Sequence, residues 1–466
     1  FIGTHQAALW MGDYGYVTLM PEIDSLRTSP DARMLPFQHA DEIVAPDYYA
    51  VSMDAGQGRP IRTELTATMH CSYLRFTFPA NNSAMILIEA ARPKVAGHVD
   101  VDVTTHEITG YNPDRMDADL GPLKLPHFRG YFVVQFRTPF THAGSYPTKD
   151  DTSLATGAFA QFRTTQGQVI EARVGTSFIS VEQARRNLGA EIPRWDFDAV
   201  SKALGESWNE KLGRITIEGA TRDQRAMFYT GLYHAMLYPR SMSEQGHYYS
   251  AFDDTVHAGE SYTDYATWDI FRAEFSLLTL LAPERIDGMI QALLQDYLEG
   301  GWMPKWPNPG YTNIMIATHA DSLVAEAVKK GFTGFDRPLA WRAVRKDALT
   351  PPDDDAHRAW ADREPGTPYE ARAGLFYLRA LGYIPADKTA EAASRTLDDA
   401  YDDWCAAQVA ASVGDASAFH LLTVRSRYYR NIFNGHSGLM QARNSDGSWA
   451  PPDAGWTEGI QFRRSP

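Results

Sequence analysis

Cysteine is almost absent from this sequence, since its 466 residues include only Cys71 and Cys405. The two lie in segments of different apolar periodicity, so we expect two unpaired core thiols and no disulfide. Long apolar runs are missing too, because no stretch approaches the ~18 residues that a membrane-spanning helix needs. An initiator methionine and a signal peptide are also missing from the start "FIGTHQ", as in a processed or incomplete product.

Positive charge is scarce, with 44 Lys and Arg against 58 Asp and Glu and a net charge of −14. Because phosphate binding needs a basic surface, we expect no nucleic acid partner.

Familiar catalytic motifs are missing as well. The sequence has no G-x-x-x-x-G-K-[ST] loop, no convincing G-x-G-x-x-G, no HExxH or paired CxxC, and no G-x-S-x-G elbow.

Aromatic residues, in contrast, are plentiful, with 11 Trp and 23 Tyr. Such rings serve as stacking platforms for sugars in carbohydrate-active proteins, and they also fill large cores. Composition alone leaves both interpretations open.

The apolar period changes along the chain. The segment Ile61–Pro79 alternates Leu65, Ala67, Met69 and Cys71 with polar residues, and short apolar runs follow between turn residues, which is typical of a β-sandwich. After residue 195 the spacing is helical. Strands followed by helices indicate separate β and α domains. We predict a β-sandwich over 1–190, a helical linker over 191–220 and a helical domain over 221–466.

Three helix ends can be predicted from local signals. Thr221 and Gln224 form a capping box at one helix start. Gly300 is expected to end the amphipathic helix that follows Pro283, and Thr318 is expected to be the N-cap of the next helix.

The stretch "YTDYATWDIFR" places Trp268 and Asp269 inside an aromatic segment. A buried carboxylate is costly without a partner, so Asp269 either caps the coming helix, with Arg272 as its ion pair, or holds a polar ligand beside the indole. The loop "EGGWMPKWPNPG" contains Trp302 and Trp306. It is either a rigid turn or a sugar-stacking loop.

Other charged residues give weaker signals. His319 stands at a helix start, where a structural role is the usual one, and Glu458 lies in a Gly-flanked loop. The segment "DDAYDDW" pairs Asp398 with Asp402, and Asp399 with Asp403, at i,i+4, where like charges repel. A solvent-exposed face is the default interpretation, although one aspartate could pack against a helix seam.

Taken together, these segments resemble glycoside hydrolase family 92, the calcium-dependent exo-α-mannosidases. The similarity rests on segments that occur in the family's order: "GTHQAALWMGDYG", "YTDYATWDIFR", "EGGWMPKW", "MIATHADSLVAEAVKKG", "DDAYDDWCAAQVA", "RSRYYRNIF" and "DGSWAPPDAGWTEG". The resemblance implies a multidomain β + α fold, in which an N-terminal β-sandwich of the supersandwich type is followed by part of an (α/α)6 toroid. The active site would lie between the two.

The implied activity is hydrolysis of terminal α-mannosyl residues of N-glycans or mannans with inversion. A Ca²⁺ ion would contact the O2 and O3 hydroxyls of the sugar, but the resemblance assigns no metal ligand here. Matched residue by residue, the candidates for binding the α-mannoside substrate are Trp10, Asp13, Trp268, Asp269, Trp302, Trp306, His319 and Glu458.

The sequence departs from the family where the catalytic acid should lie, because no "GNEP"-type segment follows "TEG". We therefore expect the acid and the base downstream of Pro466, either on a complementary C-terminal chain of the same protein or on the missing part of an incomplete chain. A non-catalytic mannose-binding fragment or remnant is the alternative function. Another (α/α)6 enzyme, such as a disaccharide phosphorylase, is a third possible function.

The acidic charge balance and the resemblance predict a secreted, extracellular or periplasmic protein.

Overall fold

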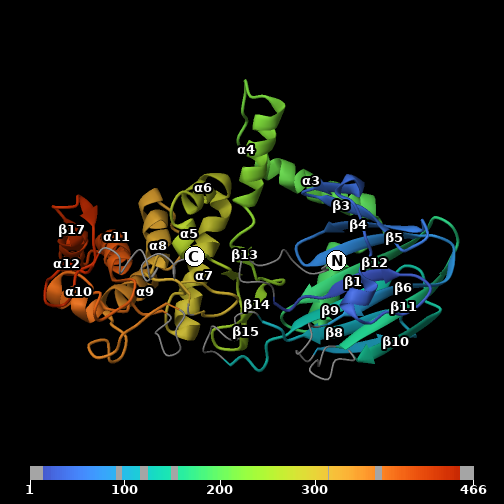
Figure 1. Ribbon diagram of the computed structural model, residues 1–466, viewed down its shortest axis with the longest axis horizontal. Helices are drawn as coiled ribbons and strands as arrows, with labels where there is room; N and C mark the ends of the chain where they lie inside the picture. Colours follow the sequence, from blue (N-terminus) through green and yellow to red (C-terminus); the bar gives the residue numbers. More distant parts are fainter. Residues whose placement is uncertain are drawn as a thin grey trace.

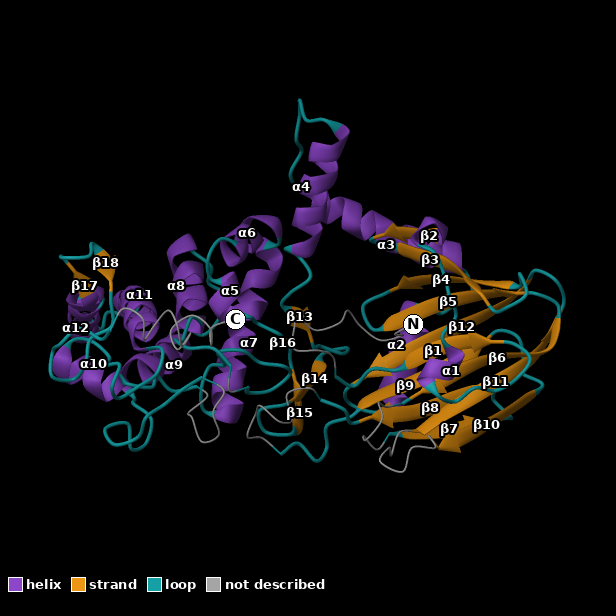
Figure 2. Cartoon of the chain, viewed as in Figure 1, coloured by secondary structure: helices purple, strands orange, loops and turns teal. Residues whose placement is uncertain are grey.

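The computed structural model describes residues 14–90, 97–115, 124–147, 156–312, 314–362 and 370–451. It has two parts that lie side by side, a strand-rich part and a helical part (Figures 1 and 2). Strands come first and helices afterwards, which confirms the predicted order of a β domain and an α domain.

The strand-rich part holds two antiparallel sheets. An eight-stranded sheet has the order β2-β3-β4-β5-β12-β9-β8-β7, and a four-stranded sheet has the order β1-β6-β11-β10. The strands are β1 (Thr18–Glu22), β2 (Glu42–Ala45), β3 (Tyr48–Asp54), β4 (Pro60–Ala67), β5 (Cys71–Phe78), β6 (Asn81–Glu89), β7 (His98–Asp102), β8 (Glu107–Asn112), β9 (Gly130–Phe136), β10 (His142–Pro147), β11 (Thr156–Thr164) and β12 (Gln168–Ser177), with the short helix α1 (Pro30–Arg33) after β1.

The two sheets enclose one apolar core. Ile86 and Ala160 of the smaller sheet belong to the same buried cluster as Leu74 and Val134 of the larger one. Alternation explains this, because in β8 every second residue is buried and its neighbours face outward. The predicted alternation breaks at Met69, however, which is 61% exposed. It lies in the turn between β4 and β5, so the segment is a hairpin.

The helical part begins against the sandwich. Helix α2 (Val181–Glu191) packs on β12, α3 (Phe197–Leu212) follows it, and α4 (Arg222–His234) projects above the junction (Figure 1). Short strands come next, namely β13 (Arg240–Ser241), β14 (His247–Ser250), β15 (Thr255–Ala258) and β16 (Tyr262–Thr263), and β17 (Phe433–Asn434) and β18 (Leu439–Met440) lie near the end of the described chain.

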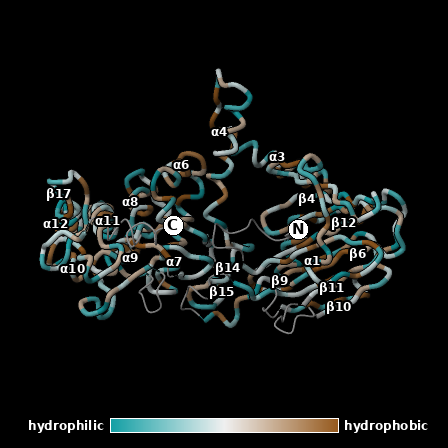
Figure 3. The backbone as a smooth tube through the Cα atoms, viewed as in Figure 1, coloured by the Kyte–Doolittle hydropathy of each residue, from teal (hydrophilic) through white to brown (hydrophobic). Residues whose placement is uncertain are grey.

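The remaining helices pack into one domain. They are α5 (Thr267–Ile270), α6 (Glu274–Leu281), α7 (Pro283–Gly300), α8 (Ala320–Lys330), α9 (Arg337–Leu349), α10 (Leu375–Leu381), α11 (Ala392–Ser412) and α12 (Ala416–Arg425). Helix α11 is the longest of the described helices and packs on α8, α9 and α12. Figure 3 shows hydrophobic stretches in both parts, α6 and β6 among them. None of the described helices is both long and apolar enough to cross a membrane.

Two helix ends follow the sequence prediction and one does not. The capping box of Thr221 and Gln224 is present. Helix α7 ends at Gly300, as predicted, although the left-handed residue that terminates it is the C-cap Gly301, with a φ of 93°. A Cβ on Gly300 would lie 2.3 Å from the Tyr311 hydroxyl oxygen, so a close approach requires that glycine. The N-cap of α8 is His319, because the Thr318 hydroxyl donates to Asp321 at 2.8 Å instead of capping.

Polar contacts join the two parts. Tyr14, just before β1, donates its hydroxyl to Asp264 at 2.8 Å, and Arg240 forms an ion pair with the same carboxylate. His127 of the sandwich lies 2.7 Å from Asp254 of the β14–β15 turn.

The predicted free thiols are confirmed, since Cys71 on β5 and Cys405 on α11 are both buried and unpaired.

Candidate functional site

Helix α5 carries the Trp-Asp pair and shows that Asp269 is no cap. Its N-cap is Ala266, without a side-chain hydrogen bond, and Asp269 is an exposed residue inside the helix. Arg272 is not its ion pair, because the guanidinium lies over the Phe271 ring at 4.9 Å. No described residue donates a hydrogen bond to the Asp269 carboxylate. The capping interpretation is therefore wrong, and this acceptor is available to a ligand.

A second carboxyl group, Glu274, lies beside Asp269. Ala273 has a φ of 64° and turns the chain between α5 and α6, so Glu274 opens the next helix. Burial raises the pKa of Glu274 to about 7, and the charge of Asp269 adds to the shift. Partial desolvation also raises the pKa of Asp269. Two carboxyl groups with raised pKa values thus flank the start of α6.

The indole of Trp268 is held in place by α11. It is half-buried, and its Nε1 donates to Asp398 Oδ2 at 3.2 Å. Burial raises the pKa of Asp398, although the positive potential of His319 opposes the shift. An indole whose N–H is already bonded presents its remaining exposed surface in a fixed orientation, which suits stacking on an apolar sugar face.

His319 lies behind this site and is almost fully buried, with 1% of its surface exposed. Its Nδ1 lies 2.8 Å from Asp402 Oδ1, and its ring stacks on Phe271 with centroids 3.9 Å apart. Burial disfavours the imidazolium, but the Asp402 charge outweighs it and raises the pKa of His319. Its Nε2 lies 4.0 Å from Asp398 Oδ1. His319 thus contacts Phe271, which follows α5, and lies beside Asp398, which binds the Trp268 indole. Through these two residues it positions the segment that carries Trp268.

The expected solvent-exposed face of "DDAYDDW" is wrong. Asp399, Asp402 and Asp403 are buried on α11. Their charges are tolerated because cations from distant segments meet them. Arg372 donates to Asp403 and Asp321, both at 2.8 Å, and Arg425 also pairs with Asp403. Burial raises the pKa of Asp399 to about 7.

The two tryptophans of the next loop are placed differently from Trp268. Trp306 is 1% exposed and belongs to the helical core, so its ring has no surface left for a sugar. One face of Trp302 is occupied by the Lys346 ammonium, 4.1 Å from the ring centroid. Between them, Lys305 accepts from Thr267 of α5 through its carbonyl oxygen at 2.5 Å. The loop therefore supports α5.

Three candidates, Trp10, Asp13 and Glu458, lie outside the described residues. Tyr14, next to Asp13, bonds to Asp264, five residues before Asp269. Sequence reasoning missed Asp398 and Glu274 as members of the site. Their signals were the i,i+4 spacing of Asp398 with Asp402 and the position of Glu274 five residues after Asp269.

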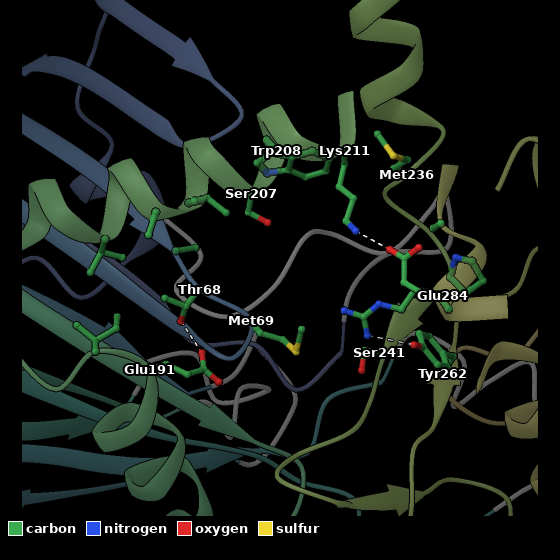
Figure 4. A pocket seen from close by; sticks show the side chains of 18 of the residues that line it. Thr68, Met69, Glu191, Ser207, Trp208, Lys211, Met236, Ser241, Tyr262 and Glu284 are labelled. Atoms are coloured by element: carbon green, nitrogen blue, oxygen red, sulfur yellow. Dashed lines mark hydrogen bonds and ion pairs between the residues drawn. The ribbon is translucent and has the colours of Figure 1, made fainter. Parts of the chain in front are cut away.

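A large cavity lies elsewhere, between the sandwich, α3 and the start of α7 (Figure 4). Its volume is about 870 Å³, and its lining includes Trp208 of α3, Met69 and Met236. Lys211 of α3 donates a hydrogen bond to Glu284 at the edge of the cavity (Figure 4). The cavity contains none of the candidate residues. Within the described ranges, three possible metal ligands come together only at Asp253, His257 and Glu299. Asp269 and Glu274 offer carboxylate oxygens without a third partner of this kind.

Family comparisons cover almost the whole chain. Residues 1–177 match the glycosyl hydrolase family 92 N-terminal domain, and residues 183–464 match the glycosyl hydrolase family 92 catalytic domain.

Three relatives illustrate the similarity. A family GH92 inverting mannosidase from Bacteroides thetaiotaomicron is 30% identical, with a TM-score of 0.86 over 96% of this chain and 59% of its own. A GH92 α-mannosidase from the same bacterium, solved with mannoimidazole, is 24% identical, with a TM-score of 0.80 over 95% of this chain and 57% of its own. An uncharacterized secreted glycosidase of Arthroderma benhamiae is 25% identical over 89% of this chain and 54% of its own length. The chain thus spans little more than half the length of these relatives.

Proposed function

This chain belongs to glycoside hydrolase family 92, and from that premise we propose that the protein is an exo-acting α-mannosidase. It would remove terminal α-mannosyl residues from N-glycans or mannans with inversion. The relative that is 30% identical is an inverting mannosidase, which supports the substrate and the stereochemistry. The observation that carries the proposal is the pairing of a fixed indole, Trp268, with an exposed and unpartnered carboxylate, Asp269.

These two side chains supply complementary contacts for a pyranose. The apolar C–H face of the sugar can stack on Trp268, while Asp269 accepts hydrogen bonds from its hydroxyls. Such charge-assisted bonds contribute about 1.5–3 kcal/mol each. Inversion further requires a carboxylic acid that protonates the leaving oxygen and a carboxylate that activates water on the opposite face. The role of Trp268 and Asp269 would be to hold the sugar between those groups.

We also propose Ca²⁺ as the assisting ion, on family membership alone. A hard cation binds sugar hydroxyls and carboxylate oxygens, and it would supply charge stabilisation at the sugar. The described residues near Trp268 do not fit a complete calcium site, because Asp269 and Glu274 lack a third ligand side chain. We therefore derive no catalytic step through the ion.

Secretion is proposed from the secreted relative, and recovery of the native protein from the culture medium or periplasm would test it.

The full-length protein should release mannose from an aryl α-mannoside and leave the matching β-mannoside intact. NMR during the first turnovers should show β-mannose as the first anomer, because an inverting enzyme reverses the α configuration. A chelator should abolish release, and Ca²⁺ should restore it while Zn²⁺ should not.

Each outcome distinguishes the alternatives. Appearance of α-mannose first would contradict inversion, and full activity in excess chelator would contradict the calcium proposal. Binding of mannose without any turnover would favour a non-catalytic mannose-binding protein. Failure to bind or hydrolyse any α-mannoside would overturn the proposed function.

A further inference from the structure

Three metal-ligand side chains meet where the β14–β15 hairpin contacts the end of α7. Asp253 comes from the hairpin turn, His257 from β15 and Glu299 from the last turn of α7. Their ligand atoms all lie within 4.8 Å of one another. His257 Nε2 is 2.8 Å from Asp253 Oδ2 and 3.9 Å from Glu299 Oε1. The imidazole therefore lies between two carboxylates from different elements.

Surrounding contacts orient His257 and Glu299 before any ligand arrives, whereas Asp253 is exposed. Tyr248 is the cross-strand partner of His257, and their rings lie 5.7 Å apart. The Tyr248 hydroxyl donates to Glu299 Oε1, which orients that carboxylate towards the hairpin. The turn itself is anchored, because Asp254 accepts from Tyr249 at 2.6 Å and lies 2.7 Å from His127 of the sandwich.

Buried acceptors on this part of α7 lack donors. The Glu299 side chain is 9% exposed, and its Oε2 has no partner among the described residues. Gln295 Oε1, one helical turn earlier on the same face, is also buried without a partner. Burial of an unpaired oxygen is costly, so a cation bound by Glu299 would satisfy an oxygen that the described residues leave unsatisfied.

We propose that Asp253, His257 and Glu299 bind a divalent transition metal ion, for which Zn²⁺ is the best match. One imidazole and two carboxylates are a nitrogen and oxygen set that suits Zn²⁺, with water in the fourth position. Bonds of about 2.0–2.2 Å place tetrahedral ligand atoms roughly 3.3–3.6 Å apart. The separations of 2.8 and 3.9 Å lie on either side of that range, so small side-chain shifts complete the geometry. Calcium would need six to eight oxygens.

The metal would act as a structural link. It would tie α7 to the hairpin, and Asp254 of the same turn already contacts His127 of the sandwich. The link would stabilise the junction of the two parts. It does not depend on the proposed mannosidase activity, because the site contains none of the residues assigned to the sugar.

Calorimetric titration of the metal-stripped protein with Zn²⁺ tests this site. We expect one equivalent to bind, and we expect His257→Gln and Glu299→Gln each to weaken it by more than the 10–100-fold typical of an outer-shell change. Glu299→Gln keeps an acceptor for Tyr248, so its fold should be preserved. Zn²⁺ should raise the melting temperature of the parent protein and not of the two variants, because a ligand of the native state stabilises it.

His98→Gln is the matched control. His98 Nε2 also lies 2.8 Å from an aspartate, Asp100, but both side chains are largely exposed and no third ligand is gathered there among the described residues. Zn²⁺ binding should be unchanged in this variant. Any of three results would overturn the proposal. His257→Gln could still bind one Zn²⁺ with unchanged affinity, the parent protein could bind no stoichiometric Zn²⁺, or the parent could bind Ca²⁺ more tightly than Zn²⁺.

Discussion

The His319–Asp402 pair contains the clearest charge effect at the level of single residues. The pKa of His319 lies above its ordinary 6.5, so its contribution to stability is complete below pH 6.5 and is lost as the pH rises through the folded value. The pKa of Asp402 lies below its ordinary 3.8 because His319 outweighs the effect of burial. The contribution of Asp402 to stability is lost as the pH falls through its lowered pKa in the folded protein. The pair should therefore stabilise most between about pH 3.8 and 6.5.

We predict that Asp402→Asn costs about 3–5 kcal/mol of unfolding free energy at pH 5.5, since it breaks a buried ion pair. The cost should be smaller at pH 9, because the charge attraction between the two side chains is lost as the pH rises through the raised pKa of His319. Denaturant unfolding at the two pH values measures the difference. Asp100→Asn removes the partner of an exposed histidine and should cost less than about 1 kcal/mol at either pH. An Asp402→Asn cost that is equal or larger at pH 9 would contradict the charged pair.

At the level of elements, two glycines allow a test of helix termination. Gly301 ends α7 with a φ of 93°, and a Cβ added there would lie 3.7 Å from Lys346 Nζ, so Gly301→Ala meets backbone strain without a clash. We expect a loss of about 1 kcal/mol. Gly231 lies inside α4 with open space around it, and Gly231→Ala should stabilise by about 0.5–1 kcal/mol. Equal effects of the two changes on chemical unfolding would contradict this assignment.

Features that depend on residues close together in the sequence could be predicted, and features that depend on residues from distant segments could not. The capping box of Thr221 needs only Gln224, three residues away, and it formed as predicted. Thr318 failed as a cap because Arg372 and Asp321 engage its hydroxyl. The aspartates of α11 were expected in solvent because their cations, Arg372 and Arg425, come from other segments. The order of domains depended on apolar periodicity, which is local.

The same distinction applies to the site. Trp268 and Asp269 could be singled out because their residue types are unusual within an apolar stretch. Asp398 could not be placed beside Trp268 from the sequence, since 130 residues separate them. Trp306 illustrates the opposite error, because an indole suited to sugar stacking is instead buried in the core. Residue type indicates chemistry, but only packing decides which side chains face a ligand.

At the scale of the whole molecule, the site depends on how the two parts meet. Asp264 receives Tyr14 from the sandwich, pairs with Arg240 and accepts from Asn308 at 3.1 Å. It lies five residues before Asp269, so the contact that joins the parts also positions the segment leading into α5. A ligand at Trp268 and Asp269 would thus bind next to the junction.

Asp269→Asn tests the central claim that this surface binds mannose. If Asp269 accepts sugar hydroxyls, calorimetric titration of the full-length protein with methyl α-mannoside should show affinity reduced by about tenfold to more than a hundredfold. The melting temperature should barely change, because no described residue depends on this carboxylate as a cap or ion-pair partner. Asp402→Asn should do the reverse and lower stability far more than affinity, because Asp402 contacts the site only through His319. Normal mannoside binding by Asp269→Asn would contradict the account.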